Sequence, residues 1–426
     1  MTHKPCLKKN PSACAHNFLI GIFCLTAVLL CEITFLRTAA WGDDLFIYRD
    51  LKTGIYSNAD NFISYRYMRH IWTASDGVMA AVVQKGGYEG RGLALYKTLD
   101  EGLYWTFEAA ISSEVDMVSD GIIDSNNNIL LVTSFLSENK TVNVNFVQLK
   151  YDSISHAWSI NPLTPVTVFA SGKNYRATRA SIAADTNGVI WCAFRLENID
   201  TGMFQIRVYY SVNGGSTWVD SGNSFGTINS MAQKCAKVIA VGPRIAMIYQ
   251  DVKIESSTAE HYKVWAYRED SQALQDGWTS GSIAKMTTAD GDPYGSHWSV
   301  AADDFGNIHL SYEDNGVMYI KYDAASESWV GPRVATNYGN YSSISIAANN
   351  DLYLFARNQS GRKIIVRRYS SASRKWDAWV TISSRKYRGI LRMSSPERFV
   401  DHLPLVYQVN VNPPYQLIYN LLDALP

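Results

Sequence analysis

The chain has 426 residues, equal numbers of acidic and basic side chains and a formal net charge of zero. A nucleic-acid-binding surface normally needs an excess of Lys and Arg, so we expect no nucleic-acid partner. Aromatic residues make up 12% of the chain and charged residues only 18%, which excludes a disordered protein and favours strands over long charged helices.

The N-terminus has the pattern of an export signal. Three lysines among the first nine residues precede an uncharged, apolar run over residues 18–30. Ala39 and Ala40 then supply small residues ahead of Trp41, where cleavage is expected. A basic start, an apolar core and a small-residue site are typical of a secretory signal peptide.

The alternative to cleavage is an uncleaved membrane anchor. Extending the apolar run to membrane-spanning length would include Glu32, which is costly inside a bilayer. We therefore interpret residues 1–40 as a signal peptide or signal anchor. The protein is expected to be secreted, periplasmic or on the cell surface, with a membrane contact only if this segment stays attached.

The rest of the chain repeats a short phrase: an apolar strand, a turn of Asp, Asn and Gly, and a second apolar strand. It reads SIAADTNGVIW over residues 181–191, SVAADDFGNIHL over 299–310 and SIAANNDLYL over 345–354. Such turn residues tolerate positive φ angles and bond to their own backbone, so each phrase predicts a β-hairpin.

A second phrase follows the hairpins and ends on Trp. It is clearest in TLDEGLYW over residues 98–105 and SVNGGSTW over 211–218, and looser copies end on Trp158, Trp329 and Trp376. The Asp or Asn can accept N–H groups of the turn, the Gly can take a conformation closed to other residues, and the Trp can fill the core.

Two such hairpins form a four-stranded sheet of about 50 residues, the size of a β-propeller blade. Six units fit between residues 62 and 383, and the tail offers three further strands. Residues 45–48 can supply the missing fourth strand and so remove an open sheet edge. We predict an all-β fold, a single β-propeller over residues 41–426, with seven blades, the N-terminal strand closing the last one, and with six blades as the alternative.

The Trp-terminated phrase resembles the Asp box of the sialidase/BNR-repeat β-propeller superfamily, in a form diverged from the catalytic sialidases. Residues 64–68, SYRYM, resemble the Tyr-Arg-Ile-Pro motif of sialidases. The resemblance implies that Arg66 helps to hold a substrate carboxylate, which suits a planar guanidinium. The loop that carries the family's acid/base Asp corresponds to residues 84–91, where Glu89 is the carboxylate present. The family's nucleophile pair has no evident counterpart, so whether the chain is an enzyme stays open.

The repeat by itself also predicts a cationic ligand-binding site. The residue shortly before each hairpin turn should begin the innermost strand, near the central channel. These positions hold mostly basic or aromatic side chains, namely Arg69 (beside Met68), Arg179, Lys234, His297, Tyr341 and Arg392. Cations that converge on a narrow channel focus a positive potential. We predict that Arg66 or Arg69, with Arg179, His297 and Arg392, binds a carboxylate-bearing ligand; the alternative is that these cations pair with Glu114, Asp116 or Asp120.

Three functions fit these observations: a sialidase-like propeller that recognises and hydrolyses an acidic carbohydrate, a polysaccharide lyase, and a non-catalytic glycan- or protein-binding propeller. A lyase removes a proton beside a uronate carboxylate, for which His297, Tyr341 and Arg392 have suitable chemistry. The catalytic candidates are therefore Glu89, His297 and Tyr341. The sequence has no Gly-rich phosphate-binding motif and no metal-ligand spacing, so we expect neither a cofactor nor a metal.

Overall fold

The computed structural model describes residues 37–41, 44–87, 90–135, 143–230, 234–255, 258–287, 297–337, 341–358, 360–383, 387 and 389–423. Over these ranges the chain forms strands joined by turns and has no helix, so the all-β prediction is confirmed. Accordingly, this part of the chain has no helix long and apolar enough to cross a membrane.

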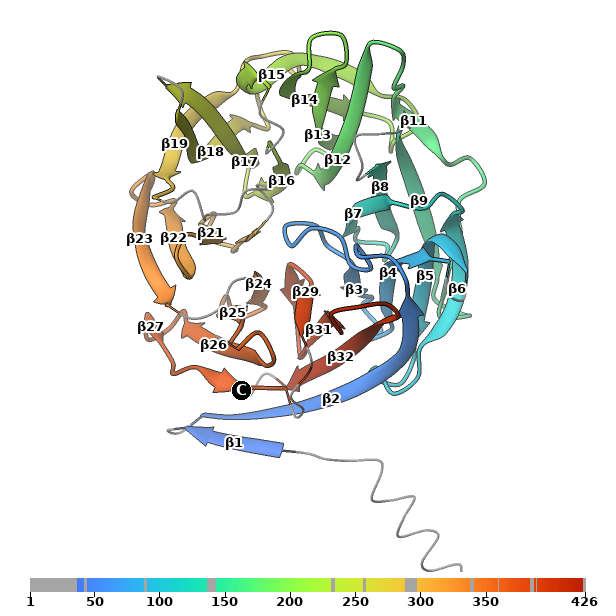
Figure 1. Ribbon diagram of the computed structural model, residues 1–426, viewed down its shortest axis with the longest axis vertical. Coiled ribbons are helices and arrows are strands. Elements are labelled where there is room, and N and C mark those ends of the chain that lie inside the picture. Colours follow the sequence, from blue (N-terminus) through green and yellow to red (C-terminus); the bar gives the residue numbers. More distant parts are fainter. Residues whose placement is uncertain are drawn as a thin grey trace, which may run out of the picture.

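The strands form sheets that stand around a common centre, as in a β-propeller (Figure 1). In each unit the first strand lies near the centre and later strands lie towards the rim. Three separate four-stranded sheets consist of β3 (Ile71–Thr73), β4 (Met79–Gly86), β5 (Arg91–Thr98) and β6 (Thr106–Ser112); β16 (Ala236–Val241), β17 (Arg244–Glu255), β18 (Thr258–Glu269) and β19 (Thr279–Lys285); and β20 (Trp298–Ala302), β21 (Ile308–Glu313), β22 (Val317–Asp323) and β23 (Ser328–Thr336).

Two further units share one hydrogen-bonded sheet because Thr178 pairs with Phe135 in parallel. This sheet consists of β7 (Met117–Ile123), β8 (Ile129–Phe135), β9 (Val144–Asp152), β10 (Ala157–Ile160) and β11 (Val166–Phe169), then β12 (Tyr175–Ala184), β13 (Ile190–Asn198), β14 (Met203–Ser211) and β15 (Val219–Asn229). Another sheet consists of β24 (Ser342–Ala347), β25 (Leu352–Arg357), β26 (Ile364–Ser370), β27 (Lys375–Trp376) and β28 (Val380–Thr381), with β30 (Arg398–Phe399) paired to β24.

The remaining sheet contains both ends of the described chain. Its strands are β29 (Ile390–Ser394), β31 (His402–Val409), β32 (Tyr415–Asp423), β2 (Asp44–Ser57) and β1 (Arg37–Trp41). β2 is antiparallel to β32, with Tyr48 opposite Leu422. The N-terminal strand therefore lies in the same sheet as the C-terminal strands (Figure 1).

The hairpin turns are specified by their own side chains. Asp124, Asp185 and Asp303 each end an inner strand, and each carboxylate accepts the backbone N–H groups two and four residues later, at 2.8–3.0 Å. Bonds of this local kind fix a turn whatever its surroundings. The repeated turn therefore sets where these three inner strands, β7, β12 and β20, end.

Tryptophans of the second phrase join neighbouring units of the propeller. Each contacts an aromatic ring of the adjacent unit, with ring centroids 5.1–5.7 Å apart: Trp105 on Tyr419, Trp218 on Phe146, Trp329 on Trp265 and Trp376 on Tyr319. Trp158 is buried with side chains of the sheet before its own. Aromatic pairs contribute about 0.5–1.5 kcal/mol beyond the area that they bury. The recurrent Trp is thus a packing element.

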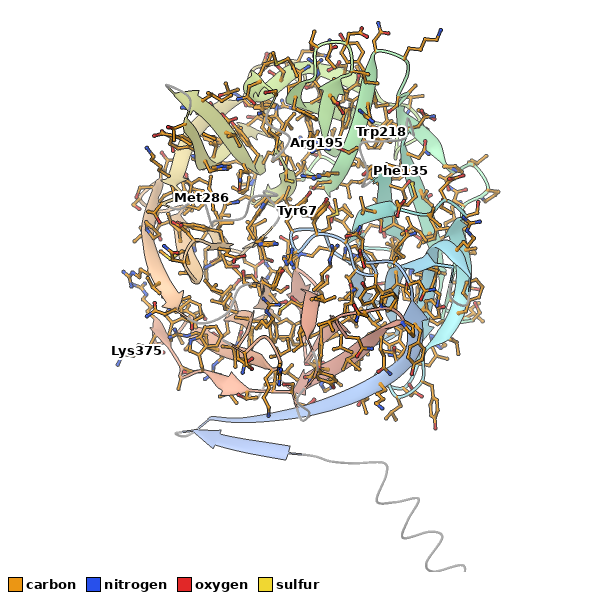
Figure 2. The ribbon with its side chains drawn as sticks, viewed as in Figure 1. Tyr67, Phe135, Arg195, Trp218, Met286 and Lys375 are labelled. Atoms are coloured by element: carbon orange, nitrogen blue, oxygen red, sulfur yellow. The ribbon has the colours of Figure 1, made fainter. Side chains whose placement is uncertain are left out.

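Residues 58–70, which connect β2 to β3, reach the centre of the molecule (Figure 1). Tyr67 lies near the centre (Figure 2) and stacks on Trp298 at 4.7 Å between ring centroids. Tyr67 and Met68 share a buried cluster with residues of the inner strands β7, β16 and β20. Because this segment leaves the sheet, the inner strand of its unit is only the three residues of β3.

Candidate functional site

A cavity of about 400 Å³ opens at the end of the molecule where the inner strands begin. We call it the arginine cavity. Its lining comes from the central segment, from the residues just before β20 and β24, and from β29: Asp60, Tyr65, Arg66, His297, Tyr341, Leu391 and Arg392. Four residues singled out from the sequence therefore meet here, although they come from distant parts of the chain.

Tyr341 lies between the charged groups of this cavity. The Cζ atoms of Arg66 and Arg357 are 3.5 Å and 4.1 Å from the centroid of its ring. The imidazole of His297 meets the ring edge-on, with centroids 4.7 Å apart. Tyr341 has a φ of +62°, which is unusual for a bulky residue and is retained only where the surroundings enforce it. The fold thus holds this phenol in a strained position among cations.

Each cavity arginine is held through a backbone carbonyl. Arg66 donates from Nη2 to Leu391 O at 3.1 Å, and Arg392 donates from Nη1 to Ile63 O at 3.3 Å. Burial lowers the pKa of Arg392, and Tyr65, Tyr341 and Asp60 partly oppose that shift. Burying a cation is unfavourable unless an anion or several acceptors compensate it. Asp60 is the one carboxylate among the described residues of the lining, so the cavity favours an anionic guest.

His297 is oriented by Glu313. The imidazole Nδ1 lies 2.5 Å from Glu313 Oε2, and both side chains are largely buried. When Nδ1 carries the imidazole proton and donates a hydrogen bond to the carboxylate, Nε2 carries the lone pair and can take up a second proton. Sequence reasoning missed Glu313, but a count across the hairpin turn would have found it, because Glu313 N donates to His297 O and Tyr312 pairs with Trp298.

Two further cations singled out from the sequence lie outside the lining of the arginine cavity. Arg179 does not line the cavity; its Cζ is 5.0 Å from the Tyr65 ring centroid, and its Nη1 is 3.1 Å from Cys235 Sγ. Burial raises the pKa of Tyr65, and Arg179 opposes that shift. Lys234 is also buried, donates to Asn229 Oδ1 at 2.6 Å and has its pKa lowered by burial to about 8. Arg179 therefore adds positive charge behind the arginine cavity, whereas Lys234 interacts with the charge of Asp251.

Arg69 lies apart from this group. Its guanidinium donates to the carbonyls of Val300, Ser395 and Ile344 at 2.6, 3.0 and 3.1 Å, so it ties together three inner segments of the propeller. It lines a second cavity of about 500 Å³ at the opposite end, where the inner strands finish.

The acidic residues considered from the sequence lie outside the lining of the arginine cavity or outside the described residues. Asp120 is fully buried and pairs with Lys237 Nζ at 2.6 Å while accepting from Arg69 N at 2.8 Å, so this acid neutralises Lys237. Glu114 and Asp116 are exposed, Asp116 in the lining of a cavity that shares Asp60 with the arginine cavity, and Glu89 lies outside the described residues. In the described ranges no cluster of three or more His, Cys, Asp or Glu side chains is placed to hold a metal.

The sequence matches no protein-family model and no curated protein sequence. Among solved structures, that of polysaccharide lyase Uly1 matches with a TM-score of 0.53 at 9% identity, over 91% of this chain and 94% of that one. The Hadza microbial sialidase Hz136 gives a TM-score of 0.45 at 9% identity, over 78% and 73% of the two chains. Penicillium chrysogenum α-L-arabinanase gives 0.45 at 10%, over 88% and 98%. At these identities likeness shows the fold alone, and the first of these three supports the β-propeller.

Proposed function

We propose that the protein binds a carboxylate-bearing polysaccharide in the arginine cavity and cleaves it by β-elimination. The observation that carries the proposal is the meeting of Arg66, Arg392, His297 and Tyr341 around one cavity. Two guanidinium groups suit a uronate carboxylate, and an imidazole and a phenol suit the two proton transfers that elimination needs. The likeness to polysaccharide lyase Uly1 is consistent with this chemistry but is a likeness of fold.

The steps follow from the geometry of the cavity. Arg66 and Arg392 pair with the carboxylate and offset the charge that develops when the neighbouring C–H bond breaks. His297, oriented by Glu313, accepts that proton on Nε2. The electron pair forms a carbon–carbon double bond and expels the glycosidic oxygen, which takes the Tyr341 hydroxyl proton. The products are an unsaturated uronate at one new chain end and a free sugar at the other.

Hydrolysis of the sialidase kind has weaker support from the residues. A glycosidase places an acid and a second activated group on either side of the scissile bond. Asp60 is the carboxylate in the described lining of the arginine cavity, and it already accepts a hydrogen bond from the Tyr415 hydroxyl. Non-catalytic binding is the second candidate, because the cationic cavity alone is enough to hold an acidic glycan.

A turnover assay separates these functions. The purified protein is incubated with a panel of uronate polymers and sialosides, and both ultraviolet absorbance of unsaturated uronate and new reducing ends are measured. The parent should produce both signals together on a uronate polymer. His297→Ala and Tyr341→Phe should each reduce the rate by about a hundredfold or more while binding persists.

Other outcomes of the assay decide against elimination. Reducing ends without unsaturation would identify a hydrolase, and binding without any product would identify a binding protein. A parent-like rate in His297→Ala would refute the assigned roles.

Two structural parts of the proposal have their own support. The pairing of β2 with β32 favours seven blades with the N-terminal strand in the last one. The turns at Thr98 and Ser211 favour the sialidase/BNR relationship, because their hydroxyls accept hydrogen bonds from Gly102 N and Gly215 N at 3.0 and 2.9 Å. Export is supported by the sequence of residues 1–40. N-terminal sequencing of the native protein should find a start near Trp41, and an intact Met1 in membrane-extractable material would instead favour the anchor.

A further inference from the structure

A third cavity, of about 430 Å³, adjoins the arginine cavity, because Asp60 lines both. We call it the amide cavity. Its lining is polar and comes from the start of the central segment, the β4–β5 hairpin and the residues before β7: Asn58, Ala59, Asp60, Asn61, Gln84, Gly86, Arg91, Val115 and Asp116. A ligand longer than one sugar in the arginine cavity can therefore continue past Asp60.

The wall shared by the two cavities is held firmly on β4. Ser57 Oγ accepts Ala59 N at 2.9 Å and Gly86 N at 3.0 Å, and it donates to Gln84 O at 2.7 Å. A Cβ atom at Gly86 would lie 2.2 Å from Ala59 N, so the two backbones pass closer than any other residue would permit. The side chains that follow Ala59 thus project from a fixed position.

Several polar side chains of the amide cavity make no hydrogen bond to other described residues of the protein. Asn61 is 9% exposed, and the side chains of Asn58, Asn61 and Arg91 make no hydrogen bond to another residue in the part of the chain that the structure describes. The amide atoms of Asn61 are not among the fully buried side-chain atoms that lack a partner, so they are open to the cavity. Asn61 can satisfy its amide from the cavity, where sugar hydroxyls both donate and accept.

Charge distinguishes the two cavities. The described lining of the arginine cavity contains two cations, Arg66 and Arg392, and one carboxylate, Asp60. The described lining of the amide cavity contains one cation, Arg91, and two carboxylates, Asp60 and Asp116. A carboxylated sugar in the amide cavity would meet two carboxylates, whereas the hydroxyl groups of an uncharged sugar can donate to them.

We propose that the amide cavity is a second sugar subsite, which takes an uncharged sugar next to the carboxylated sugar held by the arginine cavity. This inference rests on the proposed function and narrows its substrate to a mixed polymer. Polymers built of one uronate alone are poor ligands because every second position would place an anion beside Asp60 and Asp116.

Calorimetric titration tests the inference with two kinds of probe. Hyaluronan and chondroitin alternate a uronate with an uncharged sugar, whereas polygalacturonate and polymannuronate contain only uronates. The parent should bind at least one mixed polymer about tenfold more tightly than either homopolymer. Asp116→Asn should strengthen homopolymer binding several-fold and leave mixed-polymer binding unchanged, since it removes the repelling charge. Asn also tolerates the φ of +62° at this position, so the fold is preserved.

Two further variants complete the test. Asn61→Ala should weaken binding of the mixed polymer and leave homopolymer binding unchanged. Asp200→Asn removes an equal charge at an exposed turn outside both cavities and should change neither. Homopolymers that bind the parent as tightly as mixed polymers, or an Asp116→Asn variant with the parent's preference, would overturn the inference while the proposed function stands. If neither kind of polymer binds, the proposed function itself fails.

Discussion

Arg69→Met is predicted to destabilise the propeller far more than its single changed charge suggests. The Arg69 guanidinium is buried and donates to three carbonyls, those of Val300, Ser395 and Ile344. Met keeps an unbranched apolar stem but offers no donor, so three buried acceptors lose their partner at once. At about 1–1.5 kcal/mol for each bond, the free energy of unfolding should fall by about 3–4.5 kcal/mol. For a chain of this size that corresponds to a Tm about 5 °C lower.

Calorimetric or chemical unfolding measures this loss. The matched control is Arg398→Met, which removes a half-exposed arginine whose Nη2 lies 2.8 Å from Asp304 Oδ2 and should cost less than about 1 kcal/mol. Because Arg69 lies outside the arginine cavity, the folded variant should bind an acidic glycan as the parent does. A loss of stability equal to that of the control would refute the claim that the Arg69 hydrogen bonds stabilise the centre. A selective loss of glycan binding would refute the claim that Arg69 lies outside the binding site.

Two predictions concern stability elsewhere in the molecule. Gly102→Ala should cost about 2 kcal/mol or more in thermal unfolding, because Gly102 has a φ of +90° and a Cβ would lie 2.1 Å from the Tyr419 ring. Gly188→Ala, with a φ of +77° but open space, should cost only the backbone strain, and equal losses would contradict the packing argument. Burial lowers the pKa of Lys234 from 10.5 to about 8, so between these values the unfolded chain holds a proton that the folded protein has released, and stability rises with pH. From about pH 8 to about pH 10.5 the free energy of unfolding of the parent should therefore rise relative to that of Lys234→Met, and a difference that is constant with pH would contradict the shift.

The sequence was informative wherever position could be counted from a turn. Asp124, Asp185 and Asp303 fix the ends of three inner strands through bonds within the turn, so the start of each of these strands follows from its length. His297 and Tyr341 immediately precede inner strands, and Arg392 lies within one. Their convergence on a single cavity could therefore be anticipated without any knowledge of tertiary contacts.

Residues of the central segment could not be placed in this way. Arg66 and Arg69 are three positions apart, yet one lines the arginine cavity and the other bonds at the opposite end of the inner strands. Residues 58–70 form a loop, and the two-residue alternation of side chains in a strand does not apply to a loop. Asp60 was missed for the same reason, since it approaches the site from within that loop.

A crystal structure of the parent bound to a uronate-containing oligosaccharide tests the central claim most directly. The account predicts that the sugar carboxylate lies within hydrogen-bonding distance of the guanidinium groups of Arg66 or Arg392, with His297 Nε2 facing the neighbouring carbon-bound hydrogen. An oligosaccharide in the opposite cavity beside Arg69, or one in the arginine cavity with its carboxylate turned to solvent, would contradict it.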